Sequence, residues 1–212
     1  MTRKRVAILI SGRGSNMTAL LDAASAPTYP AEIVLVVSNR PNAAGLKIAA
    51  ERGVRTAVVD HEAFPTKAAF EAALEAELRA AAVNLVCLAG FMRLLTPELV
   101  QRWRNRILNI HPSLLPEFPG LDTHARALAA GARHHGASVH FVTAETDSGP
   151  VVAQSALKVR PDDTPESLAA RVLALEHRLY PEALRQVASG EVTVEGERAV
   201  SASRIRPPFD RS

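Results

Sequence analysis

Two short stretches of the 212-residue chain carry the side chains best suited to chemistry. Asn109 and His111 stand two residues apart at the end of an apolar run, and Pro112 and Pro116 follow them. Alternate residues of a strand face the same side, so an amide and an imidazole would lie together where this strand ends. Asp147 follows a second apolar stretch and could reach the same place. An amide, an imidazole and a carboxylate are what acyl transfer to an amine needs.

The three side chains would have distinct roles in such a reaction. Attack of an amine on an acyl carbon gives a tetrahedral intermediate whose oxygen gains charge, and the Asn109 amide could donate a hydrogen bond to it. His111 would help to stabilise the intermediate and move a proton from the attacking amine to the leaving nitrogen. Asp147 would favour the charged form of that imidazole, directly or through a water. No covalent nucleophile and no metal is required.

A glycine-rich segment, Ser-Gly-Arg-Gly-Ser-Asn at residues 11–16, forms a second candidate site, which we call the glycine loop. Glycines let the backbone approach an anion closely, and the N-terminus of a following helix favours negative charge. The segment matches neither the dinucleotide fingerprint, because Met17 stands at its third glycine, nor a Walker A loop. Taken alone, it is equally well read as a turn with Asn16 as the N-cap of a helix.

Apolar residues mixed with one arginine follow another predicted strand at Ala89–Leu95, a segment that we call the apolar wall. Such a mixture at the carboxyl end of a strand suits a flat heterocycle with polar edges. Core packing around one solvated arginine, Arg93, explains the same residues, and the residues alone favour it.

Apolar β-rich runs alternate with helical segments, which predicts an α/β fold with right-handed crossovers. We expect strands at 6–10, 33–37, 56–59, 85–89 and 107–111, and helices at 17–24, 43–52, 67–82 and 97–103. Further on, we expect an antiparallel pair at 137–143 and 151–159, a helix at 165–189 containing Pro181, and a hairpin at 192–201. The prediction is a Rossmann-like, mostly parallel twisted sheet with helices on both faces and an antiparallel strand pair in the C-terminal half.

Composition restricts the domain organisation and the partners. The chain is 47% hydrophobic, enough for one core, so we expect a single domain at 1–202 and a loose tail at 203–212. The single cysteine, Cys87, lies in an apolar run and is expected to be buried; the absence of an internal disulfide fits the cytoplasm. The net charge of +3 is small and scattered, which favours small-molecule substrates over nucleic acid or a membrane. A monomer or a homodimer is expected.

Together these motifs resemble the folate-dependent formyltransferases. The runs Asn-Ile-His-Pro-Ser-Leu-Leu-Pro at 109–116, Ser-Val-His-Phe-Val-Thr at 138–143 and Asp-Ser-Gly-Pro at 147–150 follow the family in order and spacing. The segment at 10–16 narrows the resemblance to members that formylate glycinamide ribonucleotide in purine synthesis. The resemblance covers nearly the whole chain. It implies transfer of the formyl group of 10-formyltetrahydrofolate, as cosubstrate, to the glycinamide amine, with no metal.

The resemblance also implies roles for further residues. The expected ribonucleotide contacts are Arg13, Gly14, Ser15, Asn16 and Glu176. The expected folate contacts are Lys67, Met92, Arg93, Leu94, Leu95 and Asn109, and the supporting residues are Ser138 and His140.

The chain departs from relatives at three positions. Lys67 stands where relatives can carry arginine, Asp122 where some carry histidine, and Ser148 where most carry glycine. A lysine lacks the bidentate fork of arginine, which weakens the case for a Lys67 contact. Residues 120–124, which include Asp122, begin a segment that resembles a mobile loop over the folate. We expect two histidines nearby, His134 and His135, at the surface.

Three other functions share parts of this pattern. Deformylases of 10-formyltetrahydrofolate use the same centre to deliver water and carry an N-terminal regulatory domain, which we expect to be absent because the first predicted strand begins at Val6. Enzymes that formylate initiator methionyl-tRNA carry a C-terminal nucleic-acid-binding domain, which we also expect to be absent. A nucleotide sensor on the same fold would tolerate loss of Asn109, His111 or Asp147, yet all three are present. We therefore expect the transferase.

Overall fold

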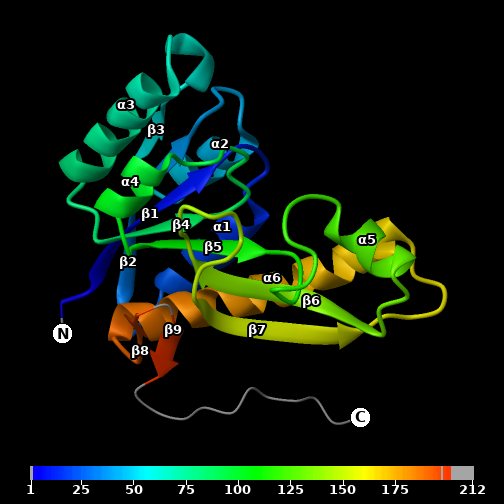
Figure 1. The fold of residues 1–212 in the computed structure, drawn as a ribbon. Coiled ribbons are helices and arrows are strands. Elements are labelled where there is room, and N and C mark those ends of the chain that lie inside the picture. The colour runs from blue at the N-terminus through cyan, green and yellow to red at the C-terminus, as the bar shows by residue number, and fades with distance from the viewer. Residues whose placement is uncertain (1, 197, 202–212) are drawn as a thin grey trace.

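A seven-stranded sheet runs through the computed structural model, which describes residues 2–196 and 198–201 (Figure 1). The strand order is β3-β2-β1-β4-β5-β6-β7. The strands are β1 Lys4–Ile10, β2 Ala31–Ser38, β3 Thr56–Val58, β4 Leu85–Leu88, β5 Ile107–His111, β6 His134–Phe141 and β7 Val151–Lys158. The first five pair in parallel, whereas β6 is antiparallel to both β5 and β7. The predicted mostly parallel sheet with antiparallel strands in the C-terminal half is confirmed.

Helices cover both faces of this sheet, as predicted (Figure 1). The helices are α1 Ser15–Ala24, α2 Ala44–Glu51, the 3-10 helix η1 His61–Ala63, α3 Lys67–Ala80, α4 Pro97–Arg102, α5 Thr123–Ala129 and α6 Pro165–Ser189. One apolar core lies between the sheet and α1, α2 and α6, and the other lies between the sheet and α3 and α4. A separate two-stranded hairpin, β8 Val192–Glu195 and β9 Arg198–Ser201, follows α6.

Strand β1 shows why the central strands read as unbroken apolar runs. Val6, Ile8 and Ile10 belong to the core on the α6 side. Ala7 and Leu9 belong to the core on the α3 side. Because a strand alternates its side chains and both faces are covered here, every position from Val6 to Ile10 is apolar. The same alternation turns Asn109 and His111 of β5 to one face, together at the strand's end.

Side-chain caps explain why several helices begin where the sequence predicts. Thr66, Thr96 and Thr164 accept hydrogen bonds from the backbone N–H groups three residues further on, at the starts of α3, α4 and α6. Pro97 and Pro165 occupy first-turn positions, where a missing N–H costs nothing. The helix at 165–189 has the predicted bounds and continues through Pro181.

Three local predictions are wrong. Helix α1 begins at Ser15 and its N-cap is Gly14, so Asn16 lies inside the helix and does not cap it. Helix α5 occupies part of a segment that we expected to be a loop. Strand β6 begins at His134, earlier than expected, and therefore buries His135, which we placed at the surface.

Other expectations concern burial, the tail and the membrane. Cys87 is buried in β4, as predicted. The expected tail at 203–212 lies outside the described residues. None of the helices in the described part of the chain has the length and apolarity needed to cross a membrane.

Candidate active site

The carboxyl ends of β1, β4 and β5 meet at one edge of the sheet, where the strand order reverses direction between β1 and β4. Ligands of open α/β sheets bind in the crevice at such a point. Ser11, directly after β1, joins two of these ends. Its N–H donates to the Gly90 carbonyl at 3.1 Å, and its hydroxyl accepts from the Met92 N–H at 2.8 Å. The glycine loop and the apolar wall are therefore held side by side, by a residue that our sequence analysis did not select.

Four polar side chains gather at the ends of β5 and β6, and we call them the polar cluster: Asn109, His111, His140 and Asp147. His111 Nδ1 lies 3.4 Å from Asp147 Oδ2, and His140 Nε2 lies 3.6 Å from Asp147 Oδ1. Asn109 Nδ2 lies 3.2 Å from His140 Nε2. The antiparallel register of β5 and β6 sets Asn109 opposite His140. The structure thus brings together the three residues that we predicted to be catalytic and one predicted to support them.

Hydrogen bonds fix the orientation of the two rings in the polar cluster. His140 Nδ1 lies 3.0 Å from the Phe141 carbonyl, and Nε2 faces both an N–H of the Asn109 amide and the Asp147 carboxylate. The second N–H of that amide stays available to another acceptor. His111 Nε2 lies 3.0 Å from the Phe118 carbonyl while Nδ1 faces Asp147, so a proton on either nitrogen has an oxygen partner.

The environment of Asp147 keeps this carboxyl charged. Burial by itself raises the pKa of the Asp147 carboxyl, but contact with His140, a hydrogen bond from the Gly120 N–H and the neighbouring His111 ring outweigh it, and the pKa lies below its ordinary value. Its backbone is left-handed, with φ of 53°, which fits the turn after β6. A charged carboxylate beside two imidazoles is the arrangement that proton transfer at His111 would need.

The glycine loop is shaped by close contacts between backbone segments. Gly14 adopts φ of 76°, and a Cβ there would lie 3.1 Å from the Gly45 Cα. The Gly45 N–H, at the start of α2, donates to the Gly12 carbonyl at 3.0 Å, and a Cβ at Gly45 would lie 2.6 Å from Ile10 Cδ1. Our sequence analysis missed Gly45, because it lies 31 residues from Gly14 in an ordinary helical segment.

Two predicted ribonucleotide contacts meet at the start of α1. Asn16 Nδ2 donates to Glu176 Oε2 of α6 at 2.6 Å, and both side chains are buried. Burial raises the pKa of the Glu176 carboxyl, although the hydrogen bond from Asn16 opposes the shift. Asn16 Oδ1 is buried without a hydrogen-bond partner among the described residues. The two other side chains of this set lie nearer the solvent: Arg13 is exposed and Ser15 is half-buried.

The apolar wall presents large apolar side chains to solvent. Met92 is 63% exposed and Leu94 is 69% exposed, whereas Leu95 packs against the core on the α3 side. Exposed apolar side chains beside a crevice suit a flat ligand. Arg93 is exposed as well. Lys67, the first residue of α3, is exposed, and its side chain forms no hydrogen bond or ion pair with the described residues.

A buried acid that the sequence analysis missed holds the end of this wall. Glu71 of α3 accepts a hydrogen bond from the Thr96 N–H at 2.7 Å and another from the Thr96 hydroxyl. Thr96 also caps α4. An alanine-rich helix gave no sign that one of its glutamates would be turned inward.

The loop after β5, residues 112–122, is held by hydrogen bonds to Ser138, a predicted supporting residue. Its hydroxyl donates to the Ser113 carbonyl at 2.6 Å and accepts from the Leu115 N–H at 3.0 Å. Gln154 of β7, which we did not select, donates to the same hydroxyl at 2.8 Å. Beyond this loop Asp122 precedes α5, where His124 Nδ1 lies 3.1 Å from His135 Nε2.

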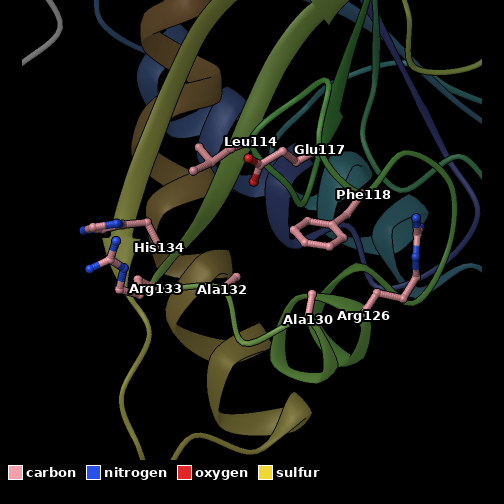
Figure 2. Close-up of a pocket in the computed structure, with 8 residues that line it drawn as sticks. All are labelled: Leu114, Glu117, Phe118, Arg126, Ala130, Ala132, Arg133 and His134. Carbon is pink, nitrogen blue, oxygen red and sulfur yellow. The ribbon is translucent and has the colours of Figure 1, made fainter.

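An open hollow of about 710 Å³ lies beside the same loop, between it, α5 and the start of β6 (Figure 2). Its lining includes Leu114, Phe118 and Arg126. None of the predicted site residues lines this hollow. Among the described residues, no group of three or more histidine, cysteine or acidic side chains is placed to hold a metal ion.

Comparison with known proteins identifies the family. The formyl transferase model matches residues 4–184. The chain belongs to the formyl transferase family. This confirms the resemblance seen in the motifs at 109–116 and 138–150.

Proteins similar to the chain are named for formyl transfer to glycinamide ribonucleotide or for purine biosynthesis. The chain is 40% identical to phosphoribosylglycinamide formyltransferase of Escherichia coli, with 96% of each chain covered. Glycinamide ribonucleotide transformylase 1 of Symbiobacterium toebii has the same fold, with a TM-score of 0.91, 46% identity and 95% of each chain covered. The trifunctional purine biosynthetic protein adenosine-3 of Gallus gallus is 47% identical over 90% of this chain, which spans only 19% of that longer protein.

Proposed function

We propose that the chain transfers the formyl group of 10-formyltetrahydrofolate to the amine of phosphoribosylglycinamide, giving formylglycinamide ribonucleotide and tetrahydrofolate in de novo purine biosynthesis. The observation that carries this proposal is the polar cluster. Asn109, His111 and Asp147 lie within contact distance of one another or of His140, beside the strand ends that carry the glycine loop and the apolar wall. The relatives named above support the choice of acceptor.

The glycine loop and α6 would hold the ribonucleotide. The phosphate approaches the backbone at Gly14 and Ser15, because the N–H groups at the start of α1 lack helical partners. Arg13 is exposed and adds a positive charge to the phosphate's surroundings. Glu176 accepts a charge-assisted hydrogen bond from the ribonucleotide, with Asn16 beside it.

The apolar wall would hold the folate. Met92 and Leu94 cover the pteridine ring, while backbone groups of residues 92–95 bind its polar edge. Lys67 and Arg93 lie exposed and remain candidates for the acidic tail of the folate. This arrangement brings the formyl group of one substrate to the amine of the other at the ends of β1, β4 and β5.

The reaction forms one carbon–nitrogen bond and breaks another. The glycinamide amine attacks the formyl carbon, and the Asn109 amide donates a hydrogen bond to the oxygen of the tetrahedral intermediate, an interaction typically worth about 2.7–4 kcal/mol. The bond from carbon to folate N10 then breaks. The proton lost by the amine passes through His111, or a water beside it, to N10, while Asp147 stabilises the ring during the transfer.

The proposal includes small-molecule partners only, a cytoplasmic location, and a monomer or a homodimer. The buried Cys87 supports a reducing compartment, since it pairs with no other cysteine of these 212 residues. The small net charge of +3 supports small anionic substrates over a nucleic acid.

One assay tests the proposed function. The purified chain is mixed with 10-formyltetrahydrofolate, and the folate product is followed by absorbance with and without phosphoribosylglycinamide. Turnover only with the ribonucleotide is expected. Equal turnover without it would instead establish a hydrolase, and no turnover in either mixture would overturn the proposal.

A further inference from the structure

A tyrosine hydroxyl buried under the sheet joins two of the strands that end in the site. Tyr180 of α6 is fully buried, and its hydroxyl lies 3.1 Å from the Leu88 carbonyl and 3.0 Å from the Leu108 carbonyl. Burial raises the pKa of the Tyr180 phenol well above its ordinary value, so the hydroxyl keeps its proton and is the donor to these oxygens. A single hydroxyl thus bridges β4 and β5.

The bridge lies where strand pairing gives way to functional segments. The pairing of β4 with β5 ends at Leu88 and Asn109. Leu88 is the last residue of β4 and directly precedes the apolar wall, and Leu108 directly precedes Asn109. Beyond this point, backbone hydrogen bonds between β4 and β5 no longer set the distance from the apolar wall to the Asn109 amide. The proposed reaction depends on that distance.

The same helix also reaches the glycine loop. Glu176 lies four residues before Tyr180, so both side chains leave the same face of α6. Glu176 contacts Asn16 at the glycine loop, while Tyr180 contacts the backbone leading to the wall and to Asn109. One helical turn therefore touches the supports of both substrates.

We propose that Tyr180 is a positioning residue for formyl transfer: its hydroxyl sets the separation between the apolar wall and Asn109 by binding the Leu88 and Leu108 carbonyls. This inference rests on the proposed function. The hydroxyl touches neither substrate, and it acts by holding the reacting groups in the geometry that the transition state needs. Misplacement of reacting groups by about 1 Å can cost about a hundredfold in rate.

The chain offers a matched control in Tyr29. Its hydroxyl donates to the carbonyl of Pro181, the residue next to Tyr180, at 2.6 Å, and its side chain is also buried. Tyr29 lies just before β2 begins, at the opposite edge of the sheet from the strand ends. The variants Tyr180→Phe and Tyr29→Phe each keep the ring and remove one buried hydroxyl bonded to backbone, one beneath the site and one away from it.

The experiment measures melting temperature, kcat and both KM values for the wild type and the two variants. Each variant should lower the melting temperature by a similar small amount, about 2–4 °C. Only Tyr180→Phe should lower kcat, by about tenfold, with both KM values within about twofold of the wild type. Repeating the assay at a second temperature well below melting separates this loss from partial unfolding, since a loss that disappears on cooling reflects unfolding.

The inference would be overturned by a kcat of Tyr180→Phe close to the wild-type value, or by equal losses of kcat in both variants. A kcat loss that disappears on cooling would overturn it as well. If the wild type itself does not turn over, it is the proposed function that fails, and the two failures are therefore distinguishable.

Discussion

The glycine loop and the polar cluster lie at neighbouring strand ends but are built from different parts of the chain. The loop consists of backbone brought close to backbone, with Gly14 and Gly45 in contact where no Cβ would fit comfortably. The cluster consists of side chains whose atoms are paired with one another, with the buried rings of His111 and His140 both against Asp147. The glycine loop depends on residues that have no side chain, whereas the polar cluster depends on particular side chains.

This difference separates binding from chemistry. An anion can be held by N–H groups that every residue has, provided that the backbone is accessible. Proton transfer needs a titratable group at a fixed position. Changes in the loop should therefore act mainly on KM for the ribonucleotide, and changes in the cluster mainly on kcat. The following variants test that separation, from the largest expected effect to the smallest.

His111→Ala should have the largest effect on turnover. Loss of the group that moves the proton should lower kcat by about 10²–10⁴-fold, while the dissociation constant of the ribonucleotide stays nearly unchanged. Single-turnover kinetics and calorimetric titration with phosphoribosylglycinamide measure the two quantities. Near-normal turnover would show that His111 takes no part in the mechanism. An equal loss of ribonucleotide binding would contradict the division of binding and chemistry between the glycine loop and the polar cluster.

Asp147→Asn should lower kcat wherever the wild type keeps this carboxylate charged. The carboxylate, whose pKa lies below its ordinary value, lies 3.4 Å from His111 and stabilises the ring while it carries the transferred proton, whereas a neutral amide does not. Because the wild type loses this charge as pH falls through the lowered pKa of Asp147, pH–rate profiles of the two proteins should converge at acid pH. Equal kcat values at neutral pH would mean that Asp147 is a turn residue only, consistent with its φ of 53°.

Gly45→Ala should raise KM for the ribonucleotide with little change in kcat. The new Cβ would lie 2.6 Å from Cδ1 of the buried Ile10 and 3.3 Å from the Gly12 carbonyl, so the Ile10 side chain, the loop or α2 must shift. We expect KM to rise about tenfold, a change of about 1.4 kcal/mol in binding. Gly53→Ala, just past the other end of α2, is the control: its φ of 73° makes alanine strained, yet a Cβ there meets nothing within 4 Å. A similar KM for both variants would contradict this account of the loop.

Glu176→Gln should have the smallest effect of the four variants. The change expected is in the free energy of unfolding, and it depends on pH. Burial raises the folded pKa of Glu176 above the ordinary 4.5, so between these two values the folded chain binds more protons than the unfolded chain. Stability of the wild type falls as pH rises through that window, and the glutamine variant lacks this loss. Urea unfolding at several pH values should show the variant gaining relative to the wild type as pH rises. A difference that stays constant with pH would contradict the prediction, whereas a higher KM for the ribonucleotide is expected in either case.

Local patterns were enough for much of the architecture. The start of α6 follows from the capping pair of Thr164 and Ser167, and the start of α4 follows from Thr96 before Pro97. These signals lie within a few residues of the element that they define. Helix α5 lacks such a signal, since Asp122 precedes it in a left-handed conformation with no side-chain cap, and the sequence analysis missed it.

Contacts between distant segments decided the rest. Asn16 favours capping by its type, but Glu176, 160 residues away, draws it into a buried hydrogen bond instead. His135 is polar by type, yet β6 continues far enough to bury it and lower its pKa to about 4, chiefly through desolvation. The type of a residue indicates which local position it favours but not which residue it will contact. Contacts with distant segments overrode the capping preference of Asn16 and the surface preference of His135.

The sequence by itself determined that Asn109 and His111 share one side of a strand that ends at a proline, because side-chain alternation is a local property of extended backbone. It also determined the glycine loop as a place where backbone is accessible. Only the tertiary structure decided that Asp147 and His140 reach the same point, that Gly45 closes on Gly14, and that Tyr180 bridges β4 and β5. The reason is physical: spacing along a chain sets which way a side chain points, whereas strand order and register set what it meets.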